Sequence, residues 1–183
     1  MPLIIADPQR DFCEGGSLGV GGGAAAVSRI DRLLNSDHGY AQVIASCDHH
    51  IDPGGRFAAE PDFVDSWPPH CAAGSAGAEF HDNLTTVTSP PSSTRATTRA
   101  AYSAFEGLTV DGKRLSAWLR ERKVDQIDVC GIATDYCVRA TALDGVREGF
   151  DTMVLLDLTA AVAPERVVEV SAELAVAGVA IRA

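Results

Sequence analysis

Cys137 lies where a thiol is most readily converted into a nucleophile. An apolar run and the short turn 131–135 precede it, and a helical pattern follows, so the cysteine is predicted in the first turn of a helix. A helix N-terminus carries about half a positive charge and unpaired backbone N–H groups, which favour a thiolate and can bind an oxyanion. The alternative is a structural cysteine that only packs beneath the sheet. The position of Cys137 favours the nucleophile.

A carboxylate follows the first apolar run of the chain. Asp7 comes directly after residues 3–6, a run that is typical of a buried strand. An aspartate at such a place can simply cap a turn or a helix. Beside a cysteine, however, it could accept the thiol proton and later deliver that proton to a leaving amine.

Asp48, His50 and His70 form a possible set of metal ligands. Three of the five histidines of the chain, His49 among them, fall within residues 49–70. One carboxylate and two imidazoles would leave positions open for water or substrate on one divalent ion such as Zn, Fe or Mn. His49 is left out because it would point away from its neighbours. The alternative is that these side chains lie on a solvent-exposed loop without a metal.

The pattern of the chain predicts the elements that position these residues. Apolar runs at 3–6, 42–47, 127–132, 153–156 and 179–181 are typical of buried strands, and helical spacing is found at 24–34, 111–122, 137–148 and 164–175. This alternation predicts an α/β fold: a single-domain three-layer sandwich with a mostly parallel, doubly wound sheet. The active site of such a fold lies outside the carboxyl ends of the strands. The long irregular stretches 48–82 and 89–107 are therefore expected to be functional loops.

Composition limits the class of protein and of partner. The chain has 183 residues, of which 46% are hydrophobic, and we expect one domain over residues 1–183. A net charge of −10 without blocks of like charge argues against nucleic acid or a membrane as partner and favours a small molecule. Five cysteines without a C-x-x-C spacing are typical of reduced thiols in the cytoplasm. A monomer and a homo-oligomer are both compatible with these features.

Five runs of residues, taken in chain order, carry a resemblance to a known family. They are DPQRDFCEGGSL at 7–18, DHHIDPG at 48–54, SWPPHC at 66–71, AYSAFEG at 101–107 and GIATDYCV at 131–138. Together they resemble the nicotinamidase/pyrazinamidase family of isochorismatase-like cysteine hydrolases. The family uses a triad of Asp, Lys and Cys, and its Asp and Cys fall on Asp7 and Cys137.

The resemblance also implies the remainder of the site. The metal ligands of the family fall on Asp48, His50 and His70, with the pyridine nitrogen of nicotinamide approaching the metal. The backbone N–H groups of Ala133 and Cys137 would form the oxyanion hole, shaped by a cis peptide between Ile132 and Ala133. The aromatic walls for the substrate would be Phe12, Trp67 and Tyr102, although packing in the core is an alternative role for Phe12.

The chain departs from the family at two positions. Arg95 stands where the family has its catalytic Lys, and the only lysines of the chain, Lys113 and Lys123, lie on or beside the helix predicted at 111–122. Arg95 could lower the pKa of the Cys137 thiol by its charge, but a planar guanidinium fits a site shaped for lysine poorly. Arg56 stands where some members have a fourth ligand, a histidine, and this change would only perturb the metal site.

The residues around Arg95 depart from the family as well, because the family has an apolar strand leading into its lysine. The run SPPSSTRATTR at 89–99 contains prolines and is predicted not to pair as a central strand, which would leave Arg95 on an unpaired, mobile segment. If residues 90–99 are encoded by CCG CCG TCG TCT ACA AGG GCG ACT ACG AGG, the same bases read two positions later encode Ala-Val-Val-Tyr-Lys-Gly-Asp-Tyr-Glu. We hypothesise a compensated frameshift, in the gene or in its sequencing.

The function expected from these features is that of a metal-dependent cysteine amidohydrolase. It would convert nicotinamide and pyrazinamide to the acid and ammonia through a thioester on Cys137, with Asp7 moving the protons. Two alternatives stay open. One is a related hydrolase of another small amide, to which the loop around Arg95 has adapted, and the other is a catalytically silent homologue that binds a metal or a pyridine.

Overall fold

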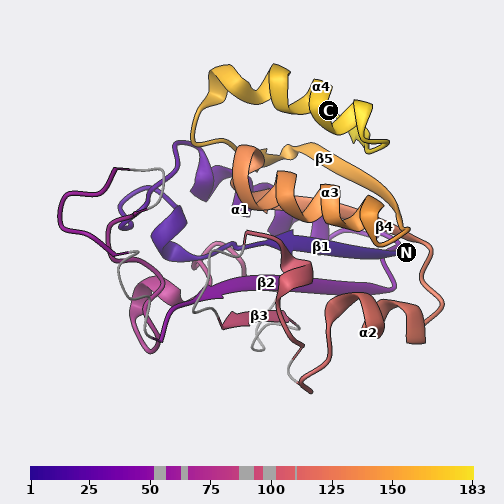
Figure 1. Cartoon of the computed structure of the whole chain (residues 1–183), viewed down its shortest axis with the longest axis horizontal. Helices are drawn as coiled ribbons and strands as arrows, with labels where there is room; N and C mark the ends of the chain where they lie inside the picture. Colours follow the sequence, from indigo (N-terminus) through magenta and orange to yellow (C-terminus); the bar gives the residue numbers. More distant parts are fainter. Residues whose placement is uncertain (52–56, 63–65, 87–92, 97–101, 110) are drawn as a thin grey trace.

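Parallel strands form the central layer of the structure (Figure 1). The computed structural model describes residues 1–183 except 52–56, 63–65, 87–92, 97–101 and 110, and only the backbone of 93–96. In this part of the chain six strands form one sheet in the order β3-β2-β1-β4-β5-β6, with every neighbouring pair parallel. The strands are β1 (Pro2–Ala6), β2 (Gln42–His49), β3 (Ser93–Ala96), β4 (Gln126–Ile132), β5 (Asp151–Ala160) and β6 (Ala180–Arg182).

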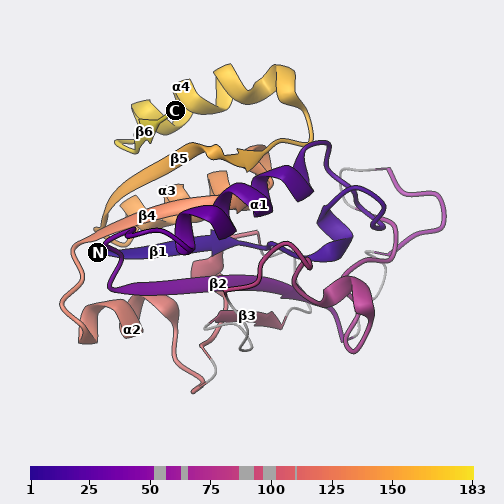
Figure 2. The ribbon, with the colours of Figure 1, turned by 180° about the vertical axis from the view of Figure 1, so that it is seen from behind.

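Helices cover both faces of the sheet, as Figures 1 and 2 show from opposite sides. One face is covered by α1 (Gly23–Leu34), whose buried residues pack on Leu3, Ile5 and Leu155. The other face is covered by α2 (Leu115–Glu121), α3 (Arg139–Arg147) and α4 (Val167–Val176). The expected three-layer, doubly wound fold is therefore present. No helix in the described ranges combines the length and the apolar character needed to cross a bilayer.

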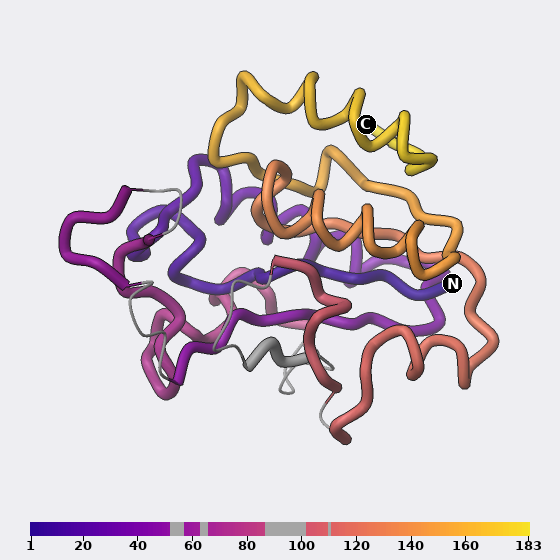
Figure 3. The backbone as a smooth tube through the Cα atoms, in the orientation of Figure 1, coloured from indigo at the N-terminus to yellow at the C-terminus, as the bar shows by residue number. Residues whose placement is uncertain are grey.

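The strand order places a topological switch point between β1 and β4. The chain proceeds from β1 outward to β2 and β3, and then returns to the other side of β1 to form β4, β5 and β6. At such a point the loops that leave neighbouring strands diverge, and ligands bind outside the carboxyl ends of the strands. Figure 3 shows the segments that follow β1 and β2 gathered beyond the carboxyl ends of these strands.

The segment around Arg95 corrects one expectation from the sequence. Residues Ser93–Ala96 form β3, which pairs parallel to β2 with Arg95 in register with Asp48. This segment is therefore paired and not free, but it lies at the edge of the sheet, as its composition requires. An edge strand needs a hydrogen-bonding neighbour on one side only, and Pro90 and Pro91 precede the four paired residues in the chain.

Gly131 permits a very close approach between β1 and β4 next to the strand ends. Its φ is +113°, and a Cβ atom at this position would lie 2.1 Å from the carbonyl oxygen and 2.6 Å from the nitrogen of Ala6. Both contacts are to backbone atoms, so a larger residue could be accommodated only by moving β1. Because Ala6 precedes Asp7, such a shift would also displace that carboxylate.

We expect Gly131→Ala to lower the free energy of unfolding by roughly 3 kcal/mol or more, because a positive φ and a backbone clash act together. Gly178→Ala is the matched control, since Gly178 has a φ of +92° but nothing within 4 Å of the added Cβ. The control should lose only ~1 kcal/mol. Urea unfolding of the three proteins measures both values, and equal losses in the two variants would contradict the steric argument.

Candidate active site and metal site

Asp7 is fully buried at the end of β1 and is held in one orientation. Its backbone has a φ of +42°, which turns the chain sharply out of the strand. The hydroxyl of Ser46, on the neighbouring strand β2, donates a hydrogen bond of 2.8 Å to Oδ1 of Asp7. Ser46 was not predicted as a site residue, although a polar residue among the apolar residues 43–47 is a usable signal. The contact aims the carboxylate, as a proton-transfer group requires.

The turn that carries Cys137 begins with an unusual peptide bond. The bond between Ile132 and Ala133 is cis, at the position that the resemblance implied. A π-helical turn, Thr134–Val138, follows and continues into α3, so Cys137 lies in the π-helical first turn of this helical segment, two residues before the regular α-helix. The carbonyl of Ala133 accepts the backbone N–H groups of Tyr136 and Val138 at 3.1 and 3.0 Å.

Two buried side chains fasten this turn to the end of β5. The carboxylate of Asp135 accepts the backbone N–H groups of Val162 and Ala163, each at 3.0 Å. The hydroxyl of Thr134 lies 2.8 Å from that of Thr159. These contacts fix the backbone on the N-terminal side of Cys137, whose own side chain is buried. The turn is therefore held by contacts with residues at and after the end of β5, in addition to the helix that it precedes.

The thiol of Cys71 is buried near the carboxyl ends of the central strands. Burial raises its pKa most strongly, and the charges of Asp48, Asp7 and Asp11, followed by Cys137, raise it further. Because β1 lies between β2 and β4, the residue that follows β1, the end of β2 and the cysteine turn after β4 are at neighbouring strand ends. Asp7 and Cys137 therefore lie at the same end of the sheet as the predicted metal ligands.

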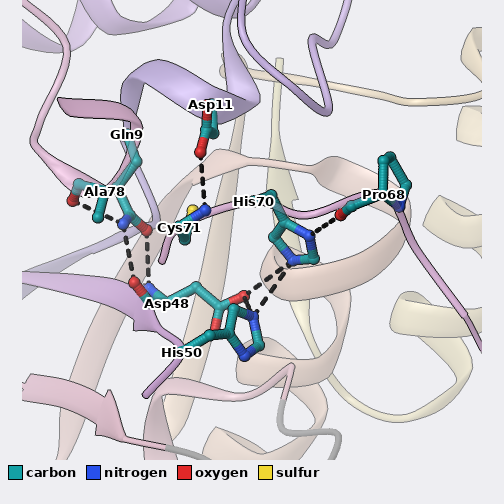
Figure 4. Close-up of polar contacts among 8 residues, drawn as sticks. All are labelled: Gln9, Asp11, Asp48, His50, Pro68, His70, Cys71 and Ala78. Carbon is teal, nitrogen blue, oxygen red and sulfur yellow. Dashed lines mark hydrogen bonds and ion pairs between the residues drawn. The ribbon is translucent and has the colours of Figure 1, made fainter. Parts of the chain in front are cut away.

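The three predicted ligands form a compact cluster, drawn in Figure 4. The Nε2 atom of His50 lies 2.9 Å from Oδ2 of Asp48 and 3.3 Å from Nε2 of His70. His70 Nε2 lies 3.4 Å from the same carboxylate oxygen. All three side chains are buried, so the two nitrogens and the oxygen face one another away from bulk water.

The donor set of this cluster fits a divalent metal ion. His70 Nδ1 lies 2.8 Å from the carbonyl oxygen of Pro68, and a proton on Nδ1 leaves the lone pair of Nε2 directed at the cluster. Two imidazole nitrogens and a carboxylate oxygen suit Zn, Fe or Mn, and three protein ligands leave positions for further groups. The arrangement is therefore a possible metal site, and it does not by itself select among these metals.

The segment after β1 holds the loop that carries His70. The backbone N–H of Cys71 donates a hydrogen bond of 2.7 Å to Oδ2 of Asp11, and Cys71 has a φ of +45°. Asp11 Oδ1 accepts the N–H of Ser17 at 3.2 Å. Asp11 was not predicted as a functional residue, because a contact across 60 residues leaves no local signal in the sequence.

Half-buried aromatic rings surround the cluster and the cysteine turn. Phe12 lies 5.8 Å from the ring of His70, so one of the three predicted aromatic residues lies at the metal ligands. The other two, Trp67 and Tyr102, lie instead against Tyr136, at ring-centroid distances of 5.8 and 5.7 Å. Tyr136 precedes Cys137 in the chain, so these rings are close to the proposed nucleophile.

Two further aromatic residues of the site, Phe57 and Tyr136, were not predicted from the sequence. Phe57 packs against both histidines, with ring centroids 5.0 Å from His50 and 5.1 Å from His70. Tyr136 was passed over although it adjoins Cys137. Proximity in sequence to a site residue was an available signal for Tyr136, whereas none was available for Phe57.

The departures from the family pattern are only partly described. Arg95 lies on β3 beside the end of β2, and the structure gives its backbone alone. Arg56, residues 90–92 and residues 97–99 lie outside the described residues. Lys113 is at the surface, where its Nζ is 2.6 Å from Oε2 of Glu121, and Lys123 follows α2 with a φ of +55°.

Comparison with known proteins places this geometry in context. A family model described as the isochorismatase domain matches residues 2–182. The chain is 49% identical to the nicotinamidase/pyrazinamidase of Mycobacterium tuberculosis over 177 residues, which cover 97% of this chain and 95% of that protein. It is 35% identical to the nicotinamidase of Escherichia coli, covering 85% of this chain and 80% of that protein.

Two solved structures share the fold closely. PnC1 from L. infantum, in complex with nicotinate, has a TM-score of 0.85 and 37% identity, covering 99% of this chain and 91% of that chain. The pyrazinamidase of Pyrococcus horikoshii, in complex with zinc, has a TM-score of 0.80 and 32% identity, covering 99% and 97%.

Proposed function

This chain belongs to the isochorismatase family, and from that premise we propose that it is a metal-dependent amidohydrolase that converts nicotinamide and pyrazinamide to the acid and ammonia. The observation that carries the proposal is the placement of Asp7, the turn of Cys137 and the cluster of Asp48, His50 and His70 at neighbouring strand ends of one sheet. A nucleophile, a proton carrier and a substrate-orienting site are the parts that such a hydrolysis requires.

In the first half of the proposed reaction, Cys137 forms a bond from Sγ to the carboxamide carbon. Asp7 takes the thiol proton, and the electron pair of the carbonyl bond moves to oxygen, where the backbone N–H groups of Ala133 and Cys137 would stabilise it. Collapse of this intermediate breaks the C–N bond, and the proton held by Asp7 leaves with the nitrogen as ammonia. Ser46 keeps Oδ1 of Asp7 in place through its hydrogen bond.

In the second half, a water molecule hydrolyses the thioester. Asp7 accepts a proton from the water, the new C–O bond forms, and the C–S bond breaks to release the acid; the proton held by Asp7 returns to Sγ and restores the Cys137 thiol. A divalent ion, which Asp48, His50 and His70 would hold, would supply a Lewis acid for the ring nitrogen of the substrate. Phe12, Trp67 and Tyr102 would enclose the ring of the substrate.

The proposal is tested by ammonia release from a panel of small amides, with protein loaded separately with Zn²⁺, Mn²⁺ or Fe²⁺. Nicotinamide and pyrazinamide should be hydrolysed faster than benzamide, which lacks a ring nitrogen. Release from a different amide alone would identify a related hydrolase. Binding of nicotinate without hydrolysis of any amide in the panel would identify a silent homologue. Arg95 in place of lysine would then be a specific cause of the lost activity.

Removal of the metal should weaken substrate binding more than it unfolds the protein. The ligands lie at and beyond the end of β2, outside the two clusters of buried apolar residues that stabilise the sheet. After chelation, calorimetry should show a loss of nicotinate affinity of at least ~10-fold, whereas far-ultraviolet circular dichroism should change little. A large loss of sheet signal would show instead that the ion is structural.

The cellular setting follows from the same features. All five cysteines, Cys13, Cys47, Cys71, Cys130 and Cys137, are buried and outside any disulfide bond, which favours the reducing cytoplasm. Hydrolysis of nicotinamide there would contribute to NAD salvage. The substrate is a small molecule, and we infer no nucleic acid or membrane partner from the acidic composition.

A further inference from the structure

The amide of Gln9 is a buried polar group that the proposed reaction does not use. Gln9 follows Asp7 by two residues and has no exposed surface. Its Oε1 accepts the backbone N–H of Asp48 at 2.7 Å, and its Nε2 donates to the carbonyl oxygen of Asp48 at 2.8 Å. Nε2 also donates to the carbonyl oxygen of Ala78 at 2.8 Å. Figure 4 shows the amide lying directly against the backbone of Asp48.

This pair of bonds continues the sheet beyond the end of β1. The backbone of β1 pairs with β2 only as far as Ala45, while β2 itself runs to His49. At Asp48 the donor and the acceptor that β1 would have supplied come from one side chain. The backbone of Asp48 is therefore held on this side by Gln9, and on the other side β2 pairs with β3.

We propose that Gln9 is a positioning residue that sets the carboxylate of Asp48 for the divalent ion. The proposal rests on the metal site of the proposed function. Oδ2 of Asp48 is within 2.9 Å of His50 and 3.4 Å of His70, so a small rotation of the Asp48 backbone would move it out of the cluster. Groups that orient metal ligands without touching the ion typically change metal affinity by roughly 10- to 100-fold when they are removed.

Two variants remove the hydrogen bonds in different ways. Gln9→Met deletes all three bonds while keeping a similar volume. Gln9→Glu retains an acceptor for the N–H of Asp48 but places an oxygen against the carbonyls of Asp48 and Ala78. The matched control is Tyr40→Phe, which removes the hydrogen bond from Tyr40 to the buried Asp128, before the opposite end of β2.

The measurements are the Kd for Zn²⁺, by competition with a chromophoric chelator, and the visible spectrum of the Co²⁺-loaded protein. Both Gln9 variants should bind Zn²⁺ ~10- to 100-fold more weakly and shift the Co²⁺ bands. Tyr40→Phe should lower the melting temperature but leave the Kd and the spectrum unchanged. A purely structural role for Gln9 would lower the melting temperature alone, as in the control.

The outcomes separate this proposal from the one on which it rests. Wild-type protein that binds neither Zn²⁺ nor Co²⁺ would overturn the metal site and the role of Gln9 together. Wild-type protein that binds Zn²⁺ while a folded Gln9 variant binds it with the same Kd and the same Co²⁺ spectrum would overturn only the role of Gln9. If Gln9→Met does not fold, Gln9→Glu, which keeps one of the three bonds, provides the comparison.

Discussion

Replacement of Cys137 by alanine is expected to abolish turnover while nicotinamide binding remains measurable. The loss in kcat should be on the order of 10⁶-fold, comparable with loss of the nucleophile in serine hydrolases. Binding should persist because Asp48, His50, His70 and the aromatic rings are unchanged. Ammonia release measures turnover, and calorimetry with nicotinamide measures binding. Substantial hydrolysis by the variant would eliminate Cys137 as the nucleophile.

Alkylation supplies an independent check of the same thiol. Burial raises the pKa of Cys13 to about 12 and also raises the pKa values of Cys71 and Cys130, so these three thiols remain protonated and unreactive at neutral pH. Cys47 and Cys137 remain, and if Cys137 is the nucleophile, a limiting amount of iodoacetamide should label it in parallel with the loss of activity. Labelling that is unchanged in Cys137→Ala would show that the reactive thiol is elsewhere.

Much of the fold could be predicted because its strands are buried on both faces. A parallel strand covered by helices on each side needs mostly apolar residues. The run at 3–6 is wholly apolar, and Asp128 is the one charged residue in the run at 127–132. The last part of β5 escaped prediction because polar residues such as Asp157 and Thr159 interrupt its apolar run. The buried middle of a strand is therefore easier to predict from the sequence than its last residues, which lie next to the candidate site.

The candidate site could be predicted only for residues whose chemistry is local to a strand end. Asp7 and Asp48 follow apolar runs directly and His50 comes two residues after Asp48, so their types and positions were informative together. Gln9, Asp11 and Phe57 act through contacts between distant segments, and such contacts leave no periodicity or spacing in the sequence. The cis peptide at Ile132 had no signal in composition and was expected only from the resemblance.

Arg95 lies on a paired strand, but its side chain differs from the lysine that the resemblance implies at this position. The prolines suggested an unpaired segment, but four residues including Arg95 pair with β2 beside Asp48. The resemblance implies that the family has its catalytic lysine here, and a guanidinium cannot reproduce a compact ammonium. We therefore expect low nicotinamidase activity for this chain, because the charge is retained but the shape of the group is not.

Two replacements distinguish the effect of the side chain at position 95 from the effect of the strand that carries it. Arg95→Lys should recover part of the activity, because the ammonium would be carried on a paired strand. Replacing residues 90–99 by Ala-Val-Val-Tyr-Lys-Gly-Asp-Tyr-Glu and one small residue should recover more, since an apolar strand would lead into the lysine. The expected rise in kcat is on the order of 10²-fold, as for a catalytic group misplaced by about 1 Å, with less effect on substrate affinity.

Steady-state kinetics of the three proteins decides between these causes. A native enzyme as fast as the segment-replaced protein would show that Arg95 is a competent substitute for lysine. Full recovery by Arg95→Lys alone would place the whole defect in the guanidinium, and recovery only with the new segment would place it in the strand. The last result would support a compensated frameshift, which sequencing of the gene tests directly: codons for residues 90–99 that cannot encode the alternative run would exclude it.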